Sequence, residues 1–283
     1  MHKPPVLGIL GGGQLARMLA LAAAPLGVKC LVVDEHADAC AGHVAPLVVA
    51  GWSEHPRLLE LAGQVDAVTF DFENVEAGLA RALADRVAVW PPPFALAVSQ
   101  DRVTEKTLFR ECGIMTAEFA AVGTRAELDA AVATIGTPAI LKTRRFGYDG
   151  KGQIRITAAA QAEEAWRALK GAPAVLEGMV PFAYEFSILL ARGEDGASVA
   201  WDAPDNRHVD GILSTSTVPA GPEIAAQAAE AVALTRRIAD ALGHVGVLTC
   251  EYFAAAQGPV FNEMAPRVHN SGHWTIEGAT TSH

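Results

Sequence analysis

Positive charge, cysteine and long apolar runs are all scarce in this 283-residue sequence. It has 22 Lys and Arg against 32 Asp and Glu, which gives a net charge of −10, and no basic stripe interrupts that acidic balance. Nucleic acid and anionic membranes bind through local positive charge, so neither is expected as a partner. An anionic substrate would need one of the few places where cations or backbone donors gather.

The four cysteines are widely spaced and form neither a CxxC pair nor a Cys/His metal pattern. Reduced thiols in a cytoplasmic protein are therefore expected. The apolar run near the N-terminus resembles a signal peptide, but 11–13, Gln14 and Arg17 interrupt it. No run reaches the length of a membrane span, which excludes a transmembrane helix of ordinary composition.

The composition is that of a compact globular protein, with 51% apolar and 19% charged residues. The first third alternates apolar runs with helical patterns. Strands are predicted at Val6–Leu10, Lys29–Val33, Ala67–Phe70 and Val87–Val89, with a helix at Gln14–Ala24 after the first strand. This pattern predicts a doubly wound parallel sheet over residues 1–98, because Pro91, Pro92 and Pro93 prevent further regular pairing.

Residues 99–283 are expected to form a second domain, with a smaller lid subdomain at about 118–182. Its predicted helices are Asp101–Cys112, one that begins with a Thr124/Glu127 capping box, and Glu223–Leu242. Its predicted strands are Ala139–Thr143, Gln153–Ile156, Val245–Phe253 and Gly258–Glu263. The Asp149-Gly150 dipeptide predicts a tight turn between the first two of these strands.

The glycine-rich turn after the first strand has three possible roles. Gly11, Gly13 and Ala16 match GxGxxG/A, and Asp34 ends the next strand, where a ribose-binding acid of a dinucleotide site would lie. An ordinary βα turn explains the same glycines. The backbone N–H groups at the helix start could also bind the phosphate of a substrate nucleotide.

A second glycine-rich segment runs from Lys142 to Gln153 and holds three glycines among four cations. An exposed hairpin with turn glycines is one interpretation. The other is a hairpin that covers a triphosphate with backbone donors while Lys142 supplies a point charge. The segment lacks GxxxxGK[ST], which excludes a Walker P-loop.

Two carboxylates in the last hairpin suggest a metal site. If the hairpin turns about Gln257, Glu251 faces Glu263 on one side of the sheet, and Asn262 points to the opposite side unless it caps the strand. Carboxylates about 5 Å apart repel by about 3 kcal/mol at an effective dielectric near 20. A proton, a basic neighbour or a divalent cation such as Mg²⁺ could relieve that repulsion. A register shifted by one residue would instead turn one carboxylate to solvent.

The polar segment 265–273 directly follows Glu263. It contains Arg267, His269 and His273, which could hold an oxyanion or a carbonyl. A surface loop is the alternative.

Several of these segments together resemble the ATP-grasp superfamily, and within it the N5-carboxyaminoimidazole ribonucleotide synthetases of purine biosynthesis. The matching stretches run in the family's order along the whole chain. They are GILGGGQLARM (8–18), TFDFENV (69–75), DRVTEK (101–106), FGYDGKGQ (146–153), HVDGIL (208–213) and NEMAPRVHNSGHWT (262–275).

The resemblance implies an ATP-grasp fold and a ligase in which ATP phosphorylates bicarbonate and the carboxyl group passes to the amine of 5-aminoimidazole ribonucleotide. It implies a homodimer. It also implies Mg²⁺, with Mn²⁺ as the alternative, held by Glu251 and Glu263.

The same resemblance assigns the nucleotide and substrate sites residue by residue. The residues implied to bind ATP are Arg102, Lys142, Gly147, Tyr148, Asp149, Gly150, Lys151, Gly152, Gln153, Glu177, Gly178, Met179, Val180, Glu185, His208, Asn262 and Glu263. Those implied to bind the ribonucleotide or bicarbonate are Gln14, Glu73, Tyr148, Asp149, Lys151, Arg267 and His273. Asp149, Arg267 and His273 are the implied catalytic residues, with Asp149 handling the proton of the amine.

Two departures from the family pattern bear on function. Lys151 stands where many relatives have Arg, and the sequence ends at His283, where the family continues with a segment whose Lys and Arg grip the substrate phosphate. We expect a truncated chain. The competing hypotheses are an NAD-dependent oxidoreductase, based on the first glycine turn, and a non-catalytic nucleotide-binding remnant.

Overall fold

The computed structural model describes residues 3–147, 152–209 and 211–283 and arranges them around three sheets. The first sheet is parallel, with strand order β3-β2-β1-β4-β5. Its strands are β1 (Val6–Leu10), β2 (Lys29–Asp34), β3 (Leu47–Val49), β4 (Ala67–Phe70) and β5 (Ala88–Val89). The order reverses between β1 and β4, so the turns after these two strands open side by side.

Helices cover both faces of this sheet because its strands are apolar on both sides. Leu10 and Val33 face one core, with Leu79 and Leu83 of α3, whereas Ile9 packs in the opposite core beside α1. The helices are α1 (Gln14–Ala23), α2 (His55–Glu60), α3 (Ala77–Ala84) and α4 (Pro93–Ser99), with short 3-10 turns η1 (Ala24–Leu26), η2 (Cys40–His43) and η3 (Leu61–Gly63).

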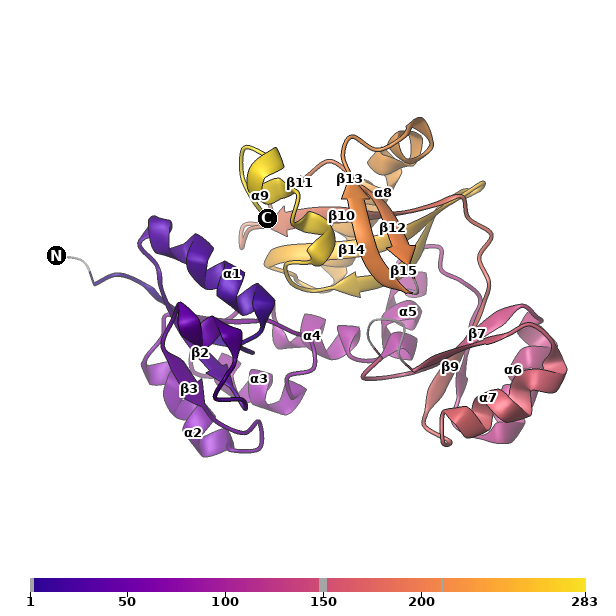
Figure 1. Cartoon of the computed structure of the whole chain (residues 1–283), viewed down its shortest axis with the longest axis horizontal. Helices are drawn as coiled ribbons and strands as arrows, with labels where there is room; N and C mark the ends of the chain where they lie inside the picture. Colours follow the sequence, from indigo (N-terminus) through magenta and orange to yellow (C-terminus); the bar gives the residue numbers. More distant parts are fainter. Residues whose placement is uncertain (1–2, 148–151, 210) are drawn as a thin grey trace.

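The second sheet has four antiparallel strands in the order β6-β9-β7-β8. They are β6 (Phe119–Val122), β7 (Ala139–Thr143), β8 (Gln153–Ile156) and β9 (Ala174–Gly178). Helices α6 (Arg125–Ile135) and α7 (Ala162–Ala168), together with η4 (Ala159–Gln161), enclose its core on one face (Figure 1). The Thr124/Glu127 capping box that begins α6 is present, as predicted.

The third sheet follows the order β13-β12-β10-β14-β15, with β11 paired to β10. Its strands are β10 (Tyr184–Arg192), β11 (Ser198–Ala200), β12 (Asp205–Val209), β13 (Ile212–Thr217), β14 (Gly246–Ala255) and β15 (Gly258–Ala265). The helices around it are α5 (Arg102–Glu111) and α8 (Pro222–Ala241), and η5 (Asn270–Gly272) and α9 (Thr275–Gly278) follow β15. In Figure 1 this sheet lies between the first and the second, which occupy opposite ends of the molecule.

The last hairpin differs from the prediction at its turn. Near the turn Ala255 pairs with Gly258, so the loop is Ala256-Gln257 rather than a turn centred on Gln257. A β-bulge then shifts the register between Glu251 and Tyr252, and beyond it Glu251 pairs with Glu263. The predicted pairing of the two carboxylates is confirmed, and the bulge is the reason that it survives the misplaced turn.

Within the described ranges, every helix is too short or too polar to cross a membrane.

Candidate functional site

Three cations converge where helix α5, the four-stranded sheet and strand β15 meet. Arg102 begins α5 and Lys106 follows one turn later on the same face, while Lys142 comes from β7. Arg102 Nη1 lies 2.6 Å from Glu263 Oε2, and Lys142 Nζ lies 3.0 Å from Glu177 Oε2. This group of Arg102, Lys106, Lys142, Glu177 and Glu263 is called the cation cluster below.

Lys106 is the buried centre of the cation cluster, with a side chain that is 1% exposed. Its Nζ donates to the carbonyl oxygen of Asn262 at 2.8 Å and lies 3.5 Å from Glu177 Oε2. Burial lowers the pKa of Lys106, whereas for Glu177 the pull of Lys142 and Lys106 outweighs burial and lowers the pKa. Lys106 therefore joins the bulged strand β15 to strand β9 of the other sheet.

The two opposed carboxylates have different surroundings. Burial would raise the pKa of Glu263, but Arg102, Lys142 and Lys106 together lower it. Burial and the charge of Glu263 both raise the pKa of Glu251, whose Oε1 lies 3.4 Å from Nε2 of His269. Arg102 contacts Glu263 directly and offsets its charge, whereas the charge of His208 lowers the pKa of Glu251 by less than burial and Glu263 raise it.

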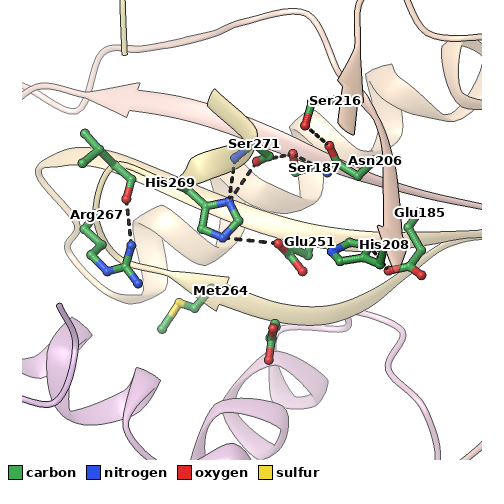
Figure 2. A network of polar contacts seen from close by, with 12 residues as sticks. Glu185, Ser187, Asn206, His208, Ser216, Glu251, Met264, Arg267, His269 and Ser271 are labelled. Carbon is green, nitrogen blue, oxygen red and sulfur yellow. Dashed lines mark hydrogen bonds and ion pairs between the residues drawn. The ribbon is translucent and has the colours of Figure 1, made fainter. Parts of the chain in front are cut away.

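His208 and Glu185 form a further pair beside the carboxylates, as Figure 2 shows. They come from the neighbouring strands β12 and β10, and His208 Nδ1 lies 3.0 Å from Glu185 Oε2. The hydrogen bond to Glu185 raises the pKa of His208, which favours the protonated ring.

The loop after β15 connects this region to the first sheet. Arg267 Nε and Nη2 lie 2.8 and 2.7 Å from Glu73 Oε2, and Nη1 donates to the carbonyl oxygen of Val268 at 3.0 Å. His273 follows in the same loop, and burial lowers its pKa. Its Nε2 is buried and has no hydrogen-bond partner among the described residues, so this polar atom is available to a ligand.

The first glycine turn is arranged differently from a dinucleotide site. Asp34 Oδ2 accepts from the backbone N–H of Gly12 at 2.7 Å, so this carboxylate stabilises the turn and is already hydrogen-bonded where a ribose hydroxyl would need it. Asp71, which follows β4, accepts from the N–H groups of Gly13 and Ala16, both at 2.7 Å. A protein carboxylate already satisfies the start of α1, which counts against the NAD hypothesis.

The remaining predicted residues lie around the same junction or outside the described residues. Gly178 and Met179 donate their N–H groups to Glu118 and Pro138, and no bond is formed by the N–H of Val180 within the described ranges. Gln14 is exposed at the start of α1, Gln153 is exposed at the start of β8, and the Gly147 carbonyl accepts from Arg102 at 3.5 Å. Tyr148, Asp149, Gly150 and Lys151 lie outside the described residues.

Gly152 forms the base of the second glycine-rich segment. Its φ is +72°, and its carbonyl accepts from the N–H of Thr143 at 2.8 Å. A Cβ at this position would lie 2.7 Å from Thr143 Oγ1, so only glycine fits without a shift.

Three residues of this region, Lys106, Glu105 and Asp71, are not among the site residues predicted from the sequence. Glu105 is buried and accepts from the backbone N–H of Met264 at 2.9 Å, which fixes β15 against α5. The available signal was helical spacing, since 102, 105 and 106 share one face of a predicted helix. Asp71 could have been suspected from its place directly after a buried strand beside the reversal of strand order.

The donor set suits Mg²⁺ that is also held by phosphate. Among the described residues, no three His, Cys, Asp or Glu side chains are grouped to hold a metal alone. Mg²⁺ commonly takes one or two protein carboxylates and completes its shell with phosphate oxygens and water. The Glu251 and Glu263 pair beside three cations fits that kind of site and does not fit an all-protein metal centre.

Two family models match the chain. The first, described as an ATP-grasp domain, matches residues 107–283. The second, described as a ribonucleotide synthetase preATP-grasp domain, matches residues 5–100.

Curated relatives share the chain's sequence over nearly its whole length. The N5-carboxyaminoimidazole ribonucleotide synthase of Pseudomonas aeruginosa is 44% identical over 98% of this chain and 76% of its own. The enzyme of the same name from Brucella melitensis is 46% identical over 95% of this chain and 75% of its own. The chain therefore spans about three quarters of the length of these relatives.

Solved structures agree with the fold. The N5-carboxyaminoimidazole ribonucleotide synthetase of Thermus thermophilus has a TM-score of 0.92 at 46% identity, covering 98% of this chain and 75% of its own. An Aspergillus clavatus synthase in complex with ADP and 5-aminoimidazole ribonucleotide has a TM-score of 0.92 at 28% identity, covering 100% and 75%.

Proposed function

Because the chain belongs to the N5-carboxyaminoimidazole ribonucleotide synthase family of ATP-grasp proteins, we propose that it carboxylates 5-aminoimidazole ribonucleotide at the expense of ATP. The carboxyl group comes from bicarbonate, and the products are N5-carboxyaminoimidazole ribonucleotide, ADP and phosphate. The single observation that carries the proposal is the cation cluster, which gathers three cations beside the paired carboxylates in a protein of net charge −10.

The cation cluster supports a triphosphate site on electrostatic grounds. Arg102 comes from α5 and Lys142 from β7, and a protein carboxylate holds them at 2.6 and 3.0 Å respectively. Phosphate oxygens can exchange with or join these carboxylates as acceptors. The segment from Gly147 to Gly152 would cover the phosphates, and the N–H of Val180, which has no partner among the described residues, would meet the adenine edge.

The chemistry divides into two displacements. A bicarbonate oxygen attacks the γ-phosphorus of ATP, and the bond to ADP breaks, which gives carboxyphosphate. The amine nitrogen of the ribonucleotide then forms a bond to the carboxyl carbon, phosphate leaves, and the amine loses a proton. We assign that proton to Asp149 on its place in the sequence motif, as it lies outside the described residues.

The loop after β15 would supply the bicarbonate site. Arg267 offers a guanidinium next to Glu73, and His273 offers a buried Nε2 with no partner within the described ranges. A guanidinium can bind both oxygens of a planar carboxylate-like anion. The ribonucleotide would lie between this loop and the turn at Gln14, near Glu73, with Tyr148 and Lys151 as further contacts.

Glu251 and Glu263 would hold Mg²⁺, with Mn²⁺ as the alternative ion. When bound, the ion neutralises charge on the transferring phosphoryl group. Glu263 also holds Arg102, and Glu251 is held in turn by His269, so both carboxylates are oriented by neighbours before any ligand binds. We further propose a cytoplasmic homodimer.

The test is ADP formation and capture of labelled bicarbonate by the purified protein with ATP, Mg²⁺ and 5-aminoimidazole ribonucleotide. We expect ADP release to require all components, and Glu263→Gln to abolish turnover while the circular dichroism spectrum is retained. Glu277→Gln, at an exposed position, is the matched control. Wild-type activity in Glu263→Gln would refute the site assignment.

The competing hypotheses give different results in the same assay. Phosphate release that stays at background with every component present would favour the non-catalytic remnant. Fluorescence detection of nicotinamide cofactor binding, without stabilisation by Mg-ATP, would favour the oxidoreductase.

A further inference from the structure

A chain of side-chain hydrogen bonds runs through the third sheet to His269 (Figure 2). Ser216 Oγ bonds Asn206 Oδ1 at 2.7 Å, and Asn206 Nδ2 bonds Ser187 Oγ at 3.0 Å. Ser187 Oγ bonds Ser271 Oγ at 2.8 Å, and Ser271 Oγ lies 2.9 Å from His269 Nδ1. Ser187 and Ser271 are 0% exposed and Asn206 is 4% exposed, so water cannot substitute for these partners.

Ser271, a member of this hydrogen-bond chain, determines which nitrogen of the His269 imidazole carries the proton. The backbone N–H of Ser271 donates to His269 Nδ1 at 3.3 Å, as part of the cap that begins η5. A backbone N–H can only donate, so Nδ1 must offer its lone pair and carries no proton. An imidazolium has protons on both nitrogens and is therefore excluded. The single ring proton is on Nε2.

The hydroxyl groups agree with this assignment. Each serine hydroxyl has one proton to donate, so the direction of one bond sets the direction of the next. Ser216 donates to Asn206, Asn206 donates to Ser187, and Ser187 donates to Ser271. Ser271 then donates its own proton to His269 Nδ1. Every donor in the hydrogen-bond chain is directed toward the His269 ring, and each hydrogen bond has one donor and one acceptor.

We propose that His269 is a positioning residue whose Nε2–H is directed at Glu251, with its tautomer set by Ser271, Ser187 and Asn206. Nε2 lies 3.4 Å from Glu251 Oε1. A neutral donor orients the carboxyl group without adding a positive charge that would repel a cation. Neither ring nitrogen can itself bind a metal ion, because Nδ1 already accepts hydrogen bonds and Nε2 carries the proton. Only the role of Glu251 as cation ligand rests on the proposed function.

The tautomer can be read directly by NMR in the ligand-free protein with ¹⁵N-labelled histidine. The His269 signals are assigned by their loss in His269→Asn. We expect a pyridine-like Nδ1 and a pyrrole-like Nε2. A protonated Nδ1, in either a neutral or a charged ring, would overturn the proposal.

The serine and asparagine links are tested by Ser187→Ala in the same spectra. The change frees the Ser271 hydroxyl from its donor, so we expect the His269 ring signals to broaden or split. Ser198→Ala, at a position on β11 outside this hydrogen-bond chain, is the matched control and should leave them unchanged. Unchanged His269 signals in Ser187→Ala would remove these residues from the proposal.

Donation to Glu251 is tested by calorimetric titration of ADP in the presence of Mg²⁺. His269→Asn can keep the acceptor of the η5 cap but lacks a donor that reaches Glu251, so we expect affinity to fall about tenfold. His269→Gln returns an N–H to the position of Nε2, and we expect it to recover most of that loss. Equal affinities for His269→Asn and wild type would contradict the positioning role.

The two proposals fail separately. If the wild-type protein does not bind Mg-ADP, the proposed function fails, and the tautomer in the ligand-free protein still decides the inference about His269. If Mg-ADP binds and Nδ1 is protonated, only the inference about His269 fails.

Discussion

Replacing Lys106 with Met tests whether this lysine holds the cation cluster together. Met keeps most of the apolar stem and removes the ammonium group. The ammonium donates to the Asn262 carbonyl at 2.8 Å and lies 3.5 Å from Glu177, and the side chain is 1% exposed. The substitution therefore breaks one charge-assisted hydrogen bond and removes one of two cations from a buried carboxylate.

The expected loss follows from these contacts. A hydrogen bond to a charged group contributes about 1.5–3 kcal/mol, and removal of one partner from a buried ion pair costs about 3–5 kcal/mol. Glu177 keeps Lys142 at 3.0 Å, so the second figure is an upper limit. Burial of the Lys106 ammonium group is itself unfavourable, so removing that group offsets part of the destabilisation. We expect the free energy of unfolding to fall by about 2–3 kcal/mol.

Urea denaturation, followed by circular dichroism and tryptophan fluorescence, measures this loss. Lys29→Met, at an exposed position, is the matched control. A loss below about 0.5 kcal/mol for Lys106→Met, equal to an ordinary surface substitution, would refute the role of Lys106.

Two further predictions concern stability. Gly152→Ala places a side chain against Thr143 at a φ of +72° and should destabilise the protein by about 1–2 kcal/mol. The control is Gly63→Ala, where an added Cβ meets nothing within 4 Å and should not change the stability. Equal urea midpoints for the two variants would contradict this prediction. Burial lowers the pKa of His244 from 6.5 in the unfolded chain to about 4 in the folded protein. The stability that neutral His244 contributes is therefore fully present above pH 6.5 and is lost as the pH falls toward 4. Relative to His244→Gln, the wild type should lose about 3 kcal/mol between about pH 7 and about pH 4 in urea titrations, and parallel pH profiles would exclude this.

Elements bounded by clear local signals could be predicted from the sequence. β1, β4, β7 and β8 have the predicted bounds; β1 and β4 are apolar runs that end at Gly11 and Asp71, and β7 and β8 pair with each other on either side of the second glycine-rich segment. The capping box at Thr124 is local in the same way. Strands β10 to β13 were not predicted, since their mixed apolar and polar residues gain strand structure by pairing with β14 and with one another.

The site could be predicted only where its geometry is local. The pairing of Glu251 with Glu263 was reached from an assumed turn at Gln257, but the structure reaches it through a different loop and a bulge. A one-residue bulge has no signature in a sequence and depends on how a strand packs against its neighbours. The same holds for the bond between Arg102 and Glu263, which are separated by 161 positions and meet only because α5 packs against β15.

The unequal surroundings of the two carboxylates bear on how this pair would hold the cation that we propose for it. Arg102 balances the charge of Glu263, so the pair does not carry two uncompensated charges in a buried place. On our proposal His269 donates to Glu251 as a neutral group, so it adds no positive charge that would compete with a cation. If both proposals hold, a neutral residue at 269 is what would make this pair a cation site rather than a structural ion pair.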